Sequence, residues 1–320
     1  MRVLITGGTG SLGHALVRRW KDSAERIVVF SRDEWKQAEM ARVYPEGGAQ
    51  GIRYFLGDVR DKTRLEQALV GIDTVVHAAA LKRVDAVAYN PVEVLKTNVL
   101  GTQNVIEAAV SAGVRQVVVV SSDKAVEPSN VYGSSKNVAE HLAVSSNVYA
   151  VPRGTRVSVV RYGNVAWSRG SVLHTWAEQA QHRYLQITDK RMTRFWLTLD
   201  DAVDVIEFSL RGASAGEIVV PKLKAASMVE VAQAFVQGDC VLNEIGLRPG
   251  GEKLHECLIG QEEAGRTREI PKGFLIEPHL PTWRKEPEYL VGNVASRYSS
   301  DMAPRMTQEE IMALLASRPV

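Results

Sequence analysis

Short runs of β-branched and other apolar residues alternate with longer amphipathic patterns through the first half of the chain. The short runs predict strands at residues 2–6, 26–30, 52–56, 74–77, 116–121 and 156–161. The longer patterns predict helices at residues 12–23, 34–44, 62–70, 92–112 and 132–146. This alternation indicates βαβ units, and the nearly continuous apolar strands indicate a parallel sheet that is buried on both faces. We therefore expect an α/β fold with a Rossmann-type, doubly wound parallel sheet.

The alternation becomes less regular after about residue 164. Helices are predicted at residues 172–182, 200–210 and 227–237, and a strand at residues 218–220. Residues 271–305 contain several prolines and little periodicity, so irregular structure is expected there. Thr307 and Glu310 have the spacing of a capping box, which predicts a last short helix. We expect residues 1–165 to form the sheet domain, with later segments added to it, and residues 166–320 to form mainly a smaller α/β part.

Composition and charge narrow the class of protein. The chain of 320 residues has 39 Lys and Arg against 37 Asp and Glu, so its net charge is 39 − 37 = +2, which gives no general attraction to nucleic acid. Every apolar run is shorter than the roughly 20 residues that span a membrane, and the N-terminus enters a strand without a signal peptide. Cys240 and Cys257 are too few for a disulfide framework and too far apart for a CxxC metal site. We expect a cytoplasmic, metal-free protein that binds neither nucleic acid nor membranes.

The first predicted strand leads directly into a glycine-rich turn. The turn satisfies two spacings, Gly8-x-Gly10-x-x-Gly13 and Gly7-x-x-Gly10-x-x-Gly13. Glycines allow a tight turn and the close approach of a pyrophosphate, which the amino end of the next helix attracts. Such turns also occur for packing alone, but the position after the first strand of a βαβ unit favours dinucleotide binding. We expect the cofactor to contact Gly7, Thr9, Gly10, Ser11, Leu12 and Gly13.

Charged residues follow the second and third predicted strands. An acid after the second strand would hold the ribose 2′-hydroxyl of NAD, whereas an arginine accommodates the 2′-phosphate of NADP. Arg32 and Asp33 both occur there, so the spacing leaves both cofactors open; because Arg32 comes first, we expect NADP. An ordinary solvated charge run is the alternative interpretation. Asp58 and Val59, after the third strand, are placed to contact adenine, although Asp58 could equally cap a helix.

A second group of polar residues follows the fifth predicted strand. Tyr132 and Lys136 lie four positions apart, so they share one face of a helix. A phenol with a pKa of about 10 is a poor base at neutral pH, and a lysine one turn away, together with a positive nicotinamide ring, lowers that pKa. Ser122 can hydrogen-bond the same substrate oxygen as Tyr132. Asp123 and Lys124 form either a structural salt pair or a second acid–base pair, which an elimination needs and a 4-epimerase does not.

The glycine turn combined with Tyr-x-x-x-Lys is the signature of the short-chain dehydrogenase/reductase superfamily. Within it, the chain resembles the soluble UDP-N-acetylglucosamine 4,6-dehydratases that invert C5 and start the pseudaminic acid pathway. The resemblance covers nearly the whole chain and becomes weaker after about Pro271. It is carried by residues 6–13, 31–37, 57–61, 77–82, 90–91, 97–98, 122–125, 132–136, 161–165, 168–172, 188–189, 192–195 and 248–250.

The resemblance implies oxidation at C4, loss of water across C5–C6 and return of hydride to C6. Tyr132 would take the proton of the C4 hydroxyl, while Lys136 tunes the phenol and orients the nicotinamide ribose. Lys124 would remove the C5 proton as the general base, and Asp123 would protonate the departing C6 hydroxyl. A lysine base must be neutral, so we expect burial and the nicotinamide charge to depress the pKa of Lys124.

The resemblance also implies which residues bind the ligands. Cofactor contacts would come from Ser31, Arg32, Asp33, Lys36, Asp58, Val59, Ala80, Tyr132 and Lys136. Substrate contacts would come from Lys82, Asn164, Val172, Arg194, Arg248 and Glu252, with the arginines on the diphosphate and Glu252 on the ribose. Taken alone, each substrate candidate is more typical of a solvated surface, and His77 and His255 are expected to be structural. The family further implies a homo-oligomer, with a hexamer as one option.

Three positions depart from the family pattern. Ser122 stands where the family usually has threonine, a change that keeps the hydroxyl. Gly250-Gly251 has one glycine more than the usual Arg-Pro-Gly-Glu-Lys, which could displace Glu252. Trp167 replaces a small residue beside the sugar site and could alter the preferred sugar. The alternative functions are a UDP-sugar 4-epimerase, in which Lys124 is a bystander, and a non-enzymatic NADP-binding regulator.

Overall fold

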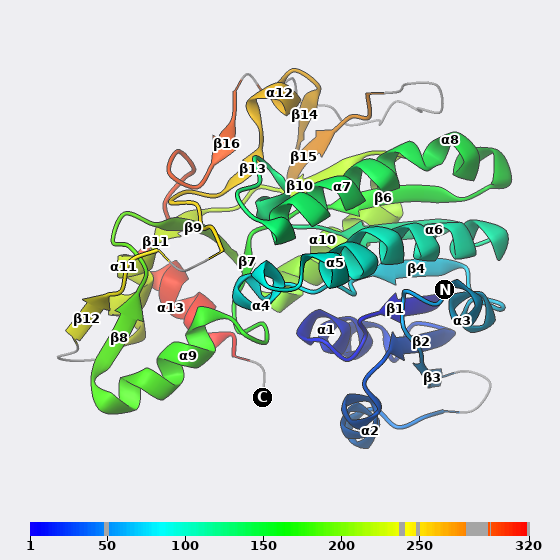
Figure 1. Cartoon of the computed structure of the whole chain (residues 1–320), viewed down its shortest axis with the longest axis horizontal. Helices are drawn as coiled ribbons and strands as arrows, with labels where there is room; N and C mark the ends of the chain where they lie inside the picture. Colours follow the sequence, from blue (N-terminus) through cyan, green and yellow to red (C-terminus); the bar gives the residue numbers. More distant parts are fainter. Residues whose placement is uncertain (48–50, 237–240, 248–249, 280–293, 295, 319–320) are drawn as a thin grey trace.

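A nine-stranded sheet lies at the centre of the computed structural model, which describes residues 1–47, 51–236, 241–247, 250–279, 294 and 296–318 (Figure 1). The strand order is β14-β15-β10-β6-β5-β4-β1-β2-β3. The strands are β1 (Arg2–Thr6), β2 (Arg26–Ser31), β3 (Gly51–Leu56), β4 (Thr74–His77), β5 (Gln116–Val120), β6 (Arg156–Val160), β10 (Ile218–Pro221), β14 (Thr267–Ile270) and β15 (Gly273–Ile276). Every pair from β3 to β10 is parallel, and β15 and β14 continue the sheet in antiparallel pairing. The predicted doubly wound α/β fold is confirmed.

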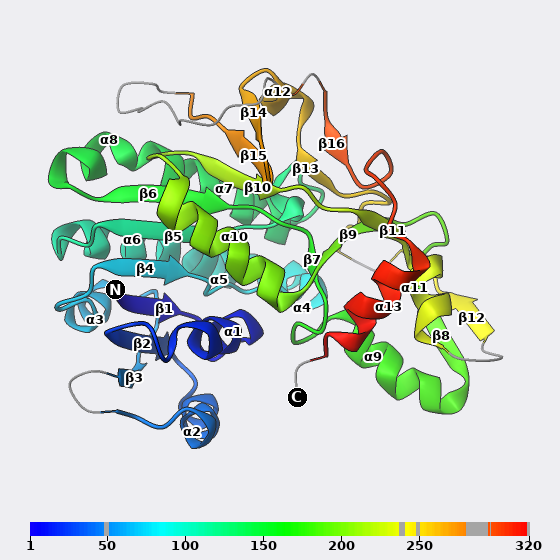
Figure 2. The same ribbon diagram turned by 180° about the vertical axis from the view of Figure 1, so that it is seen from behind.

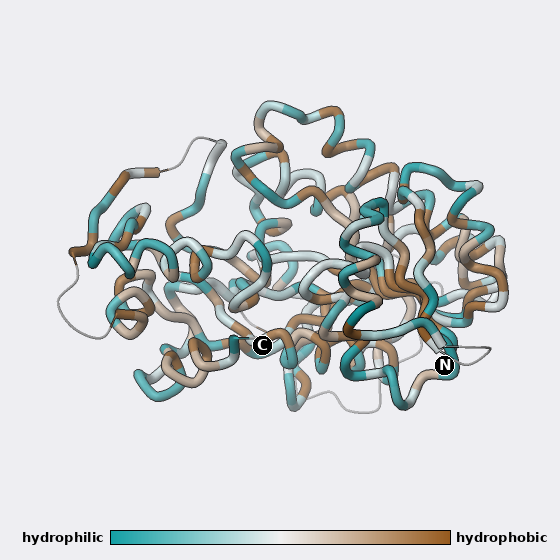
Figure 3. The backbone as a smooth tube through the Cα atoms, turned by 90° about the horizontal axis from the view of Figure 1, so that it is seen from below, coloured by the Kyte–Doolittle hydropathy of each residue, from teal (hydrophilic) through white to brown (hydrophobic). Residues whose placement is uncertain are grey.

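Helices cover both faces of the sheet. On one face, α6 (Gly101–Ser111) lies between α3 (Lys62–Ala68) and α7 (Val131–Ser145), and α7 continues into the short turns α8 (Asn147–Ala150) and η3 (Val151–Arg153). On the other face, α1 (Ser11–Trp20) packs against α10 (Leu199–Gly212), as Figure 2 shows. Helix α2 (Glu34–Val43) follows β2. Because helices exclude water from both faces, the middle residues of β1 and β5 are almost completely buried, and hydrophobic segments gather inside this larger body (Figure 3).

The helix predicted at residues 92–112 forms as three consecutive pieces. These are α5 (Pro91–Val94), a π-helical turn η1 (Leu95–Leu100) and α6, and the short helix α4 (Val84–Ala88) precedes them. The π turn faces the sheet with Asn98, whose side chain donates to Leu81 O (3.0 Å) and Ser135 Oγ (2.9 Å) and accepts from Leu81 N (2.8 Å). These buried hydrogen bonds tie the loop after β4 to α7, which explains why the regular helix is interrupted here.

A second, smaller body follows the sheet domain in sequence. It contains β7 (Asn164–Val165), β8 (Tyr184–Ile187), β9 (Thr193–Leu197), β11 (Ala225–Ser227), β12 (Val241–Glu244), α9 (Val172–Gln179), the turn η4 (Ala180–His182), α11 (Met228–Phe235) and α13 (Gln308–Ala316). Its own hydrophobic cluster includes Trp167, Trp176 and Leu314. The capping box predicted at Thr307 and Glu310 is present and starts α13.

The expectation of irregular structure across residues 271–305 is wrong in part. Residues Gly273–Ile276 form β15, which pairs with β10, and β16 (Tyr298–Ser299) pairs with β13 (Cys257–Ile259). Both strands are too short for a clear periodicity. β10 and β13 lie far away in sequence from β15 and β16, although β15 also pairs with β14 directly before it. The larger body also includes four elements that come after residue 165. Strands β10, β14 and β15 extend the large sheet, and helix α10 covers it.

Candidate active site

The predicted catalytic residues meet at the carboxyl edge of β5. The turn η2 (Asp123–Ala125) follows this strand, and α7 begins after the cap residue Asn130, whose Oδ1 accepts from Gly133 N at 2.9 Å. A Cβ on Gly133 would lie 2.3 Å from the carbonyl oxygen of Lys124. Only a glycine therefore lets the first turn of α7 touch η2, and this contact places Tyr132 beside the residues that follow β5.

Asp123 and Lys124 form the centre of a buried polar cluster. Asp123 is 0% exposed, and its Oδ1 accepts hydrogen bonds from Ser122 Oγ (2.8 Å) and from Lys124 Nζ (3.0 Å). Asp123 Oδ2 is buried and has no hydrogen-bond partner among the described residues. Burial raises the pKa of Asp123, against the opposing charge of Lys124. The raised pKa makes Asp123 easier to protonate than an exposed aspartate, and Oδ2 is the oxygen that no hydrogen bond occupies.

Lys124 differs from the prediction. Its Nζ also donates to Asn164 Oδ1 (3.2 Å) and forms an ion pair with Glu256 Oε1 at 3.4 Å. Burial alone would lower the pKa of Lys124, but the carboxylates of Asp123 and Glu256 outweigh burial and raise the pKa above the ordinary lysine value. The expected depression of the Lys124 pKa is therefore wrong for the chain itself, because no local motif indicates the second carboxylate.

Glu256 is the residue of this cluster that the sequence analysis missed. It is 2% exposed, its Oε2 lies 2.9 Å from Lys253 Nζ, and Arg194 adds a further positive charge nearby. Burial would raise the pKa of Glu256, but the charges of Lys124, Arg194 and Lys253 together lower it. Glu256 lies 132 positions after Lys124, just before β13, so no local motif connects the two residues.

Tyr132 and Lys136 lie on α7 beside this cluster. Burial raises the pKa of Tyr132, while the charge of Lys124 and the Ser122 hydroxyl oppose the change. Lys136 Nζ donates to Val120 O at 2.6 Å, and burial lowers the pKa of Lys136 to about 8. The expected lowering of the Tyr132 pKa is therefore not produced by the chain's own charges.

The glycine turn fits a dinucleotide. On the protein side it is closely packed, because a Cβ on Gly13 would lie 2.0 Å from Gly8 O, and Gly7 has a left-handed φ of +65°. A Cβ on Gly10 would meet only Gly7 O, at 3.1 Å, so the outer side of the turn is open. Arg169 adds a positive charge that the sequence analysis did not assign to the cofactor site: its Nη1 donates to Thr9 O (3.0 Å). Its backbone N–H donates to Ser11 Oγ (2.9 Å). Leu12 is half-buried.

The end of β2 presents positive charge. Asp33 caps α2 by accepting from Lys36 N (3.1 Å) and also pairs with the Lys36 ammonium, so its carboxylate is engaged within the chain. Ser31 Oγ accepts from Gln37 Nε2 (3.1 Å). The Arg32 side chain is 55% exposed and lies 3.8 Å from Asp58 Oδ2.

The loop after β3 settles one open alternative. Asp58 accepts from Arg60 N (3.0 Å), and the cap of α3 is Asp61, so Asp58 is not the helix cap. Val59 is buried against Gly101, and Ala80 is half-buried after β4. Contacts of Asp58, Val59 and Ala80 with a cofactor stay predictions.

The predicted substrate residues have different surroundings. Lys82 follows β4, and burial of its amino group together with the charge of Lys124 lowers its pKa. Arg194 is 5% exposed and donates to the backbone oxygens of residues 193, 253 and 254, so its contact with a diphosphate stays a prediction. Val172 begins α9 and packs against the smaller body's core. Arg248 lies outside the described residues.

The additional glycine of residues 250–251 lies against the start of α7. Gly251 has a φ of +89°, its carbonyl oxygen accepts from Asn130 Nδ2 (2.8 Å), and a Cβ there would lie 2.5 Å from Ser129 O. The loop that carries Glu252 therefore packs beside the catalytic helix, and a role for Glu252 in substrate binding stays a prediction.

Trp167 has a different position from the one expected. Its indole is 5% exposed inside the smaller body's core, and its Nε1 donates to Leu315 O (2.9 Å) in α13. The side chain anchors the last helix instead of facing a sugar. The expectation that this indole selects the sugar is therefore not supported by its contacts.

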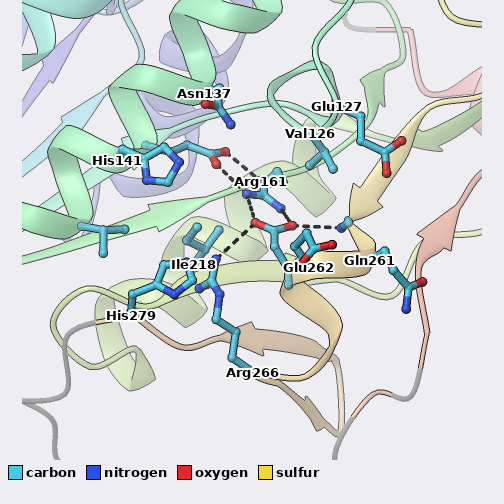
Figure 4. A pocket seen from close by; sticks show the side chains of 14 residues that line it. Val126, Glu127, Asn137, His141, Arg161, Ile218, Gln261, Glu262, Arg266 and His279 are labelled. Atoms are coloured by element: carbon cyan, nitrogen blue, oxygen red, sulfur yellow. Dashed lines mark hydrogen bonds and ion pairs between the residues drawn. The ribbon is translucent and has the colours of Figure 1, made fainter.

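Arg161 ties the C-terminal segment to the sheet. It follows β6 and forms ion pairs with Glu140 of α7 (2.5 Å) and with Glu263 of α12 (Gln261–Ala264) at 2.7 Å. Its Nη1 also donates to Leu258 O (2.9 Å). These residues line a separate cavity of about 410 Å³ (Figure 4). The contacts hold β13, and with it Glu256, against the catalytic edge.

A family model described as polysaccharide biosynthesis protein matches residues 3–278. The chain belongs to this family. A UDP-N-acetylglucosamine 4,6-dehydratase (inverting) from Campylobacter jejuni serotype O:2 is 39% identical, over 96% of this chain and 95% of the relative. A protein named UDP-glucose 4-epimerase from Rickettsia conorii is 36% identical, over 98% of this chain and 94% of that relative. The predicted relation to the inverting dehydratases is confirmed.

Two solved structures share the fold of this family member. Pen from Bacillus thuringiensis is 33% identical with a TM-score of 0.91, over 99% of this chain and 97% of that one. DesIV, a dTDP-glucose 4,6-dehydratase from Streptomyces venezuelae solved with NAD, is 25% identical with a TM-score of 0.70, over 79% of this chain and 86% of that one. Both similarities support the predicted α/β fold.

Other expectations concern groups outside the cluster. His77 is 1% exposed between the hydroxyls of Thr6 (2.7 Å) and Thr102 (2.9 Å), and burial lowers its pKa to about 3, which agrees with a structural role. His255 contacts Thr193 Oγ1 at 2.8 Å.

Within the described ranges, no group of three metal-ligating side chains occurs and no helix is long and apolar enough to cross a membrane. Cys240 lies outside the described residues, and Cys257 is a free, buried thiol.

Substitution of Lys136 by methionine tests the buried ammonium group. The folded pKa of about 8 lies below the ordinary value of 10.5, so between these values the unfolded chain binds more protons and native stability rises with pH. The cost of burying the charge is therefore largest near pH 7. Between pH 7 and pH 10, we expect the native chain to gain roughly 1–3 kcal/mol of unfolding free energy relative to Lys136→Met.

Urea unfolding of both proteins at the two pH values measures this difference. The exposed Lys272→Met is the matched control for loss of a lysine charge, and it should show no such trend. A stability difference between the native chain and Lys136→Met that stays constant with pH contradicts the burial argument.

Proposed function

We propose that this chain is a UDP-N-acetylglucosamine 4,6-dehydratase that inverts C5, a lyase whose product is a UDP-2-acetamido-2,6-dideoxy-4-hexulose. The observation that carries the proposal is the buried Asp123–Lys124 pair beside Tyr132, at the sheet edge that also carries the glycine turn. Oxidation at C4 needs only Tyr132, Lys136 and Ser122. A second acid–base pair fits a second proton-transfer step, the loss of water. The relation to the Campylobacter enzyme supports this assignment.

The proposed cofactor is NADP, which the glycine turn, Arg169, Arg32 and Lys36 would hold. When bound, it would supply hydride transfer from C4 and back to C6. The engagement of Asp33 in capping α2 leaves the exposed Arg32 as the group that suits a 2′-phosphate. A solved relative contains NAD, so NAD is the alternative to test.

Tyr132 and Lys136 act at C4. The phenolate of Tyr132 takes the proton of the C4 hydroxyl, and Ser122 orients the same oxygen. Lys136 holds its proton against Val120 O and, with a pKa of about 8, keeps positive charge available on this face of α7 at neutral pH. The cluster is closed to water by burial, which strengthens each of these contacts.

Asp123 and Lys124 act at C5 and C6. The 4-keto group makes the C5 proton acidic, and Lys124 removes it. Asp123, whose buried Oδ2 carries the proton, donates it to the departing C6 hydroxyl. The substrate then loses water. A proton from solvent is delivered to C5 on the opposite face, and the proton that Tyr132 took from the C4 hydroxyl returns to solvent, so the proton count closes. Asn164 orients Lys124 through its Oδ1. Lys82, Val172, Arg194, Arg248 and Glu252 are proposed to hold the sugar nucleotide.

A UDP-sugar 4-epimerase is the second candidate, because relatives of similar identity carry that name. An epimerase would use Tyr132 and Lys136 in the same way and would leave Lys124 without a chemical role. The two candidates predict different products from the same substrate.

Incubation with UDP-N-acetylglucosamine in D2O separates the two functions. We expect a product that has lost water and carries deuterium at C5, because the proton removed at C5 is replaced from exchangeable groups. Mass spectrometry and proton NMR of the product give both readings. Formation of the C4 epimer alone, with no loss of water, would overturn the proposal.

Two substitutions separate the stages of the proposed reaction in that assay. Tyr132→Phe should stop the reaction before C4 oxidation, whereas Lys124→Ala should allow reduced cofactor to form and slow water loss on the order of 10²-fold or more. No turnover of the native chain, with cofactor binding unchanged in both variants, would instead support a non-enzymatic regulator.

Arg32→Ala tests the choice of cofactor. Loss of a charged contact to the 2′-phosphate is worth about 1.5–3 kcal/mol, so NADP affinity should fall about 10- to 100-fold while NAD affinity changes little. Calorimetric titration of the purified chain with each dinucleotide measures this. Arg42→Ala, an exposed arginine later in α2, is the control. An equal loss for both dinucleotides, or tighter binding of NAD by the native chain, argues against NADP.

A further inference from the structure

Glu256 occupies a position that the dehydration steps leave unexplained. Glu256 is 2% exposed, and its carboxylate lies 3.4 Å from Lys124 Nζ, which also lies 3.0 Å from Asp123 Oδ1. A buried carboxylate is costly unless it is paired, so this placement needs a reason. Lys124 is thus an ammonium group shared by two carboxylates.

The backbone and neighbours of Glu256 hold it firmly in place. Its N–H donates to Ser300 Oγ (2.9 Å), and its carbonyl accepts from Ser300 N (2.8 Å). On its outer side, Lys253 Nζ lies 2.9 Å from Oε2 and also donates to Val126 O (2.8 Å). The charged groups that face Glu256 are therefore Lys124, Lys253, Arg194 and the more distant Asp123.

Two carboxyl groups beside one lysine allow the cluster to hold the protons that the elimination needs. The elimination needs Asp123 protonated as the acid and Lys124 neutral as the base at the same moment. If Asp123 were the lone counter-ion of Lys124, it would be ionised and could not donate. A second carboxylate can balance the ammonium charge and leave Asp123 in its acid form.

We propose that Glu256 is the counter-ion of Lys124 and accepts its proton when Lys124 acts as a base, which keeps Asp123 available as the acid. This inference rests on the proposed dehydratase function for its role in turnover, but not for the resting protonation state. Glu256 is a positioning residue, since it acts on the substrate only through Lys124.

The proton balance of this cycle closes. At rest, Asp123 and Lys124 are protonated and Glu256 is ionised. The Lys124 proton moves to Glu256, Lys124 takes the C5 proton, and Asp123 gives its proton to the C6 hydroxyl, which leaves as water. Asp123 is now ionised, with Lys124 and Glu256 protonated. The Glu256 proton then passes through Lys124 to Asp123, and the resting state returns without an external acid or base.

Glu256→Gln tests the proposal, because glutamine keeps the size and polarity of the side chain and removes its charge. Asp123 should then become the counter-ion of Lys124 and lose its proton. Infrared difference spectra between the purified native chain and each variant should show the band of a buried protonated carboxyl group in the native protein. The band should be absent from Glu256→Gln, and Asp123→Asn identifies it by removing it.

The same variant separates the two chemical stages. In rapid mixing with UDP-N-acetylglucosamine, reduced cofactor should still form, while water loss slows on the order of 10²-fold, since acid and base coexist only when the Lys124 proton moves onto Asp123. Glu256→Asp should recover part of the rate. Glu269→Gln, a partly exposed carboxylate of β14 that pairs with Lys222 away from the Arg161 contacts, is the structural control and should keep both the band and the ratio of the two stages.

Persistence of the carboxyl band in Glu256→Gln, or an equal slowing of both stages, would overturn the proposal. If the native chain does not dehydrate the substrate, the proposed function fails. The infrared comparison still decides the resting role of Glu256 in that case, because it needs no substrate.

Discussion

The site depends on one buried ionic arrangement, in which the Lys124 ammonium lies between the carboxyl groups of Asp123 and Glu256. Three titratable groups in so little water cannot all take their ordinary charge states. Burial raises the pKa of Asp123, and its two carboxylate neighbours raise that of Lys124. The proposed acid, the lysine and the carboxylate that would take the lysine's proton therefore lie in one cluster before any substrate is present.

The rest of the fold brings these groups together from distant parts of the chain. The parallel sheet places the end of β5 at its carboxyl edge, and Gly133 lets α7 approach closely enough to add Tyr132. Asn164 comes from β7 in the smaller body. Arg161 clamps α12 and β13 onto the sheet, which fixes the segment that carries Glu256. Loosening that clamp would act on the chemistry without touching a reacting atom.

The sequence predicted the sheet, the glycine turn and the Ser122–Lys136 group because each is local or strictly spaced. It failed where structure depends on contacts between distant residues. Glu256 is one such residue. Without its carboxylate, burial and the nicotinamide charge were expected to lower the pKa of Lys124. The π turn around Asn98 interrupts a good helical pattern to satisfy buried hydrogen bonds with Leu81 and Ser135. Trp167 was expected beside the sugar site from its place in the sequence, but its side chain packs in the hydrophobic core of the smaller body.

The most direct test of this account is the ionisation of Lys124 itself. Nitrogen-15 NMR of the lysine side chains in the full chain, assigned with Lys124→Arg, follows its amino group through a pH titration. We predict a pKa above the ordinary value of 10.5 in the native protein and a lower pKa in the double variant Asp123→Asn/Glu256→Gln, which removes both carboxylates. A native pKa below 10.5, or one that the double substitution leaves unchanged, would contradict this account.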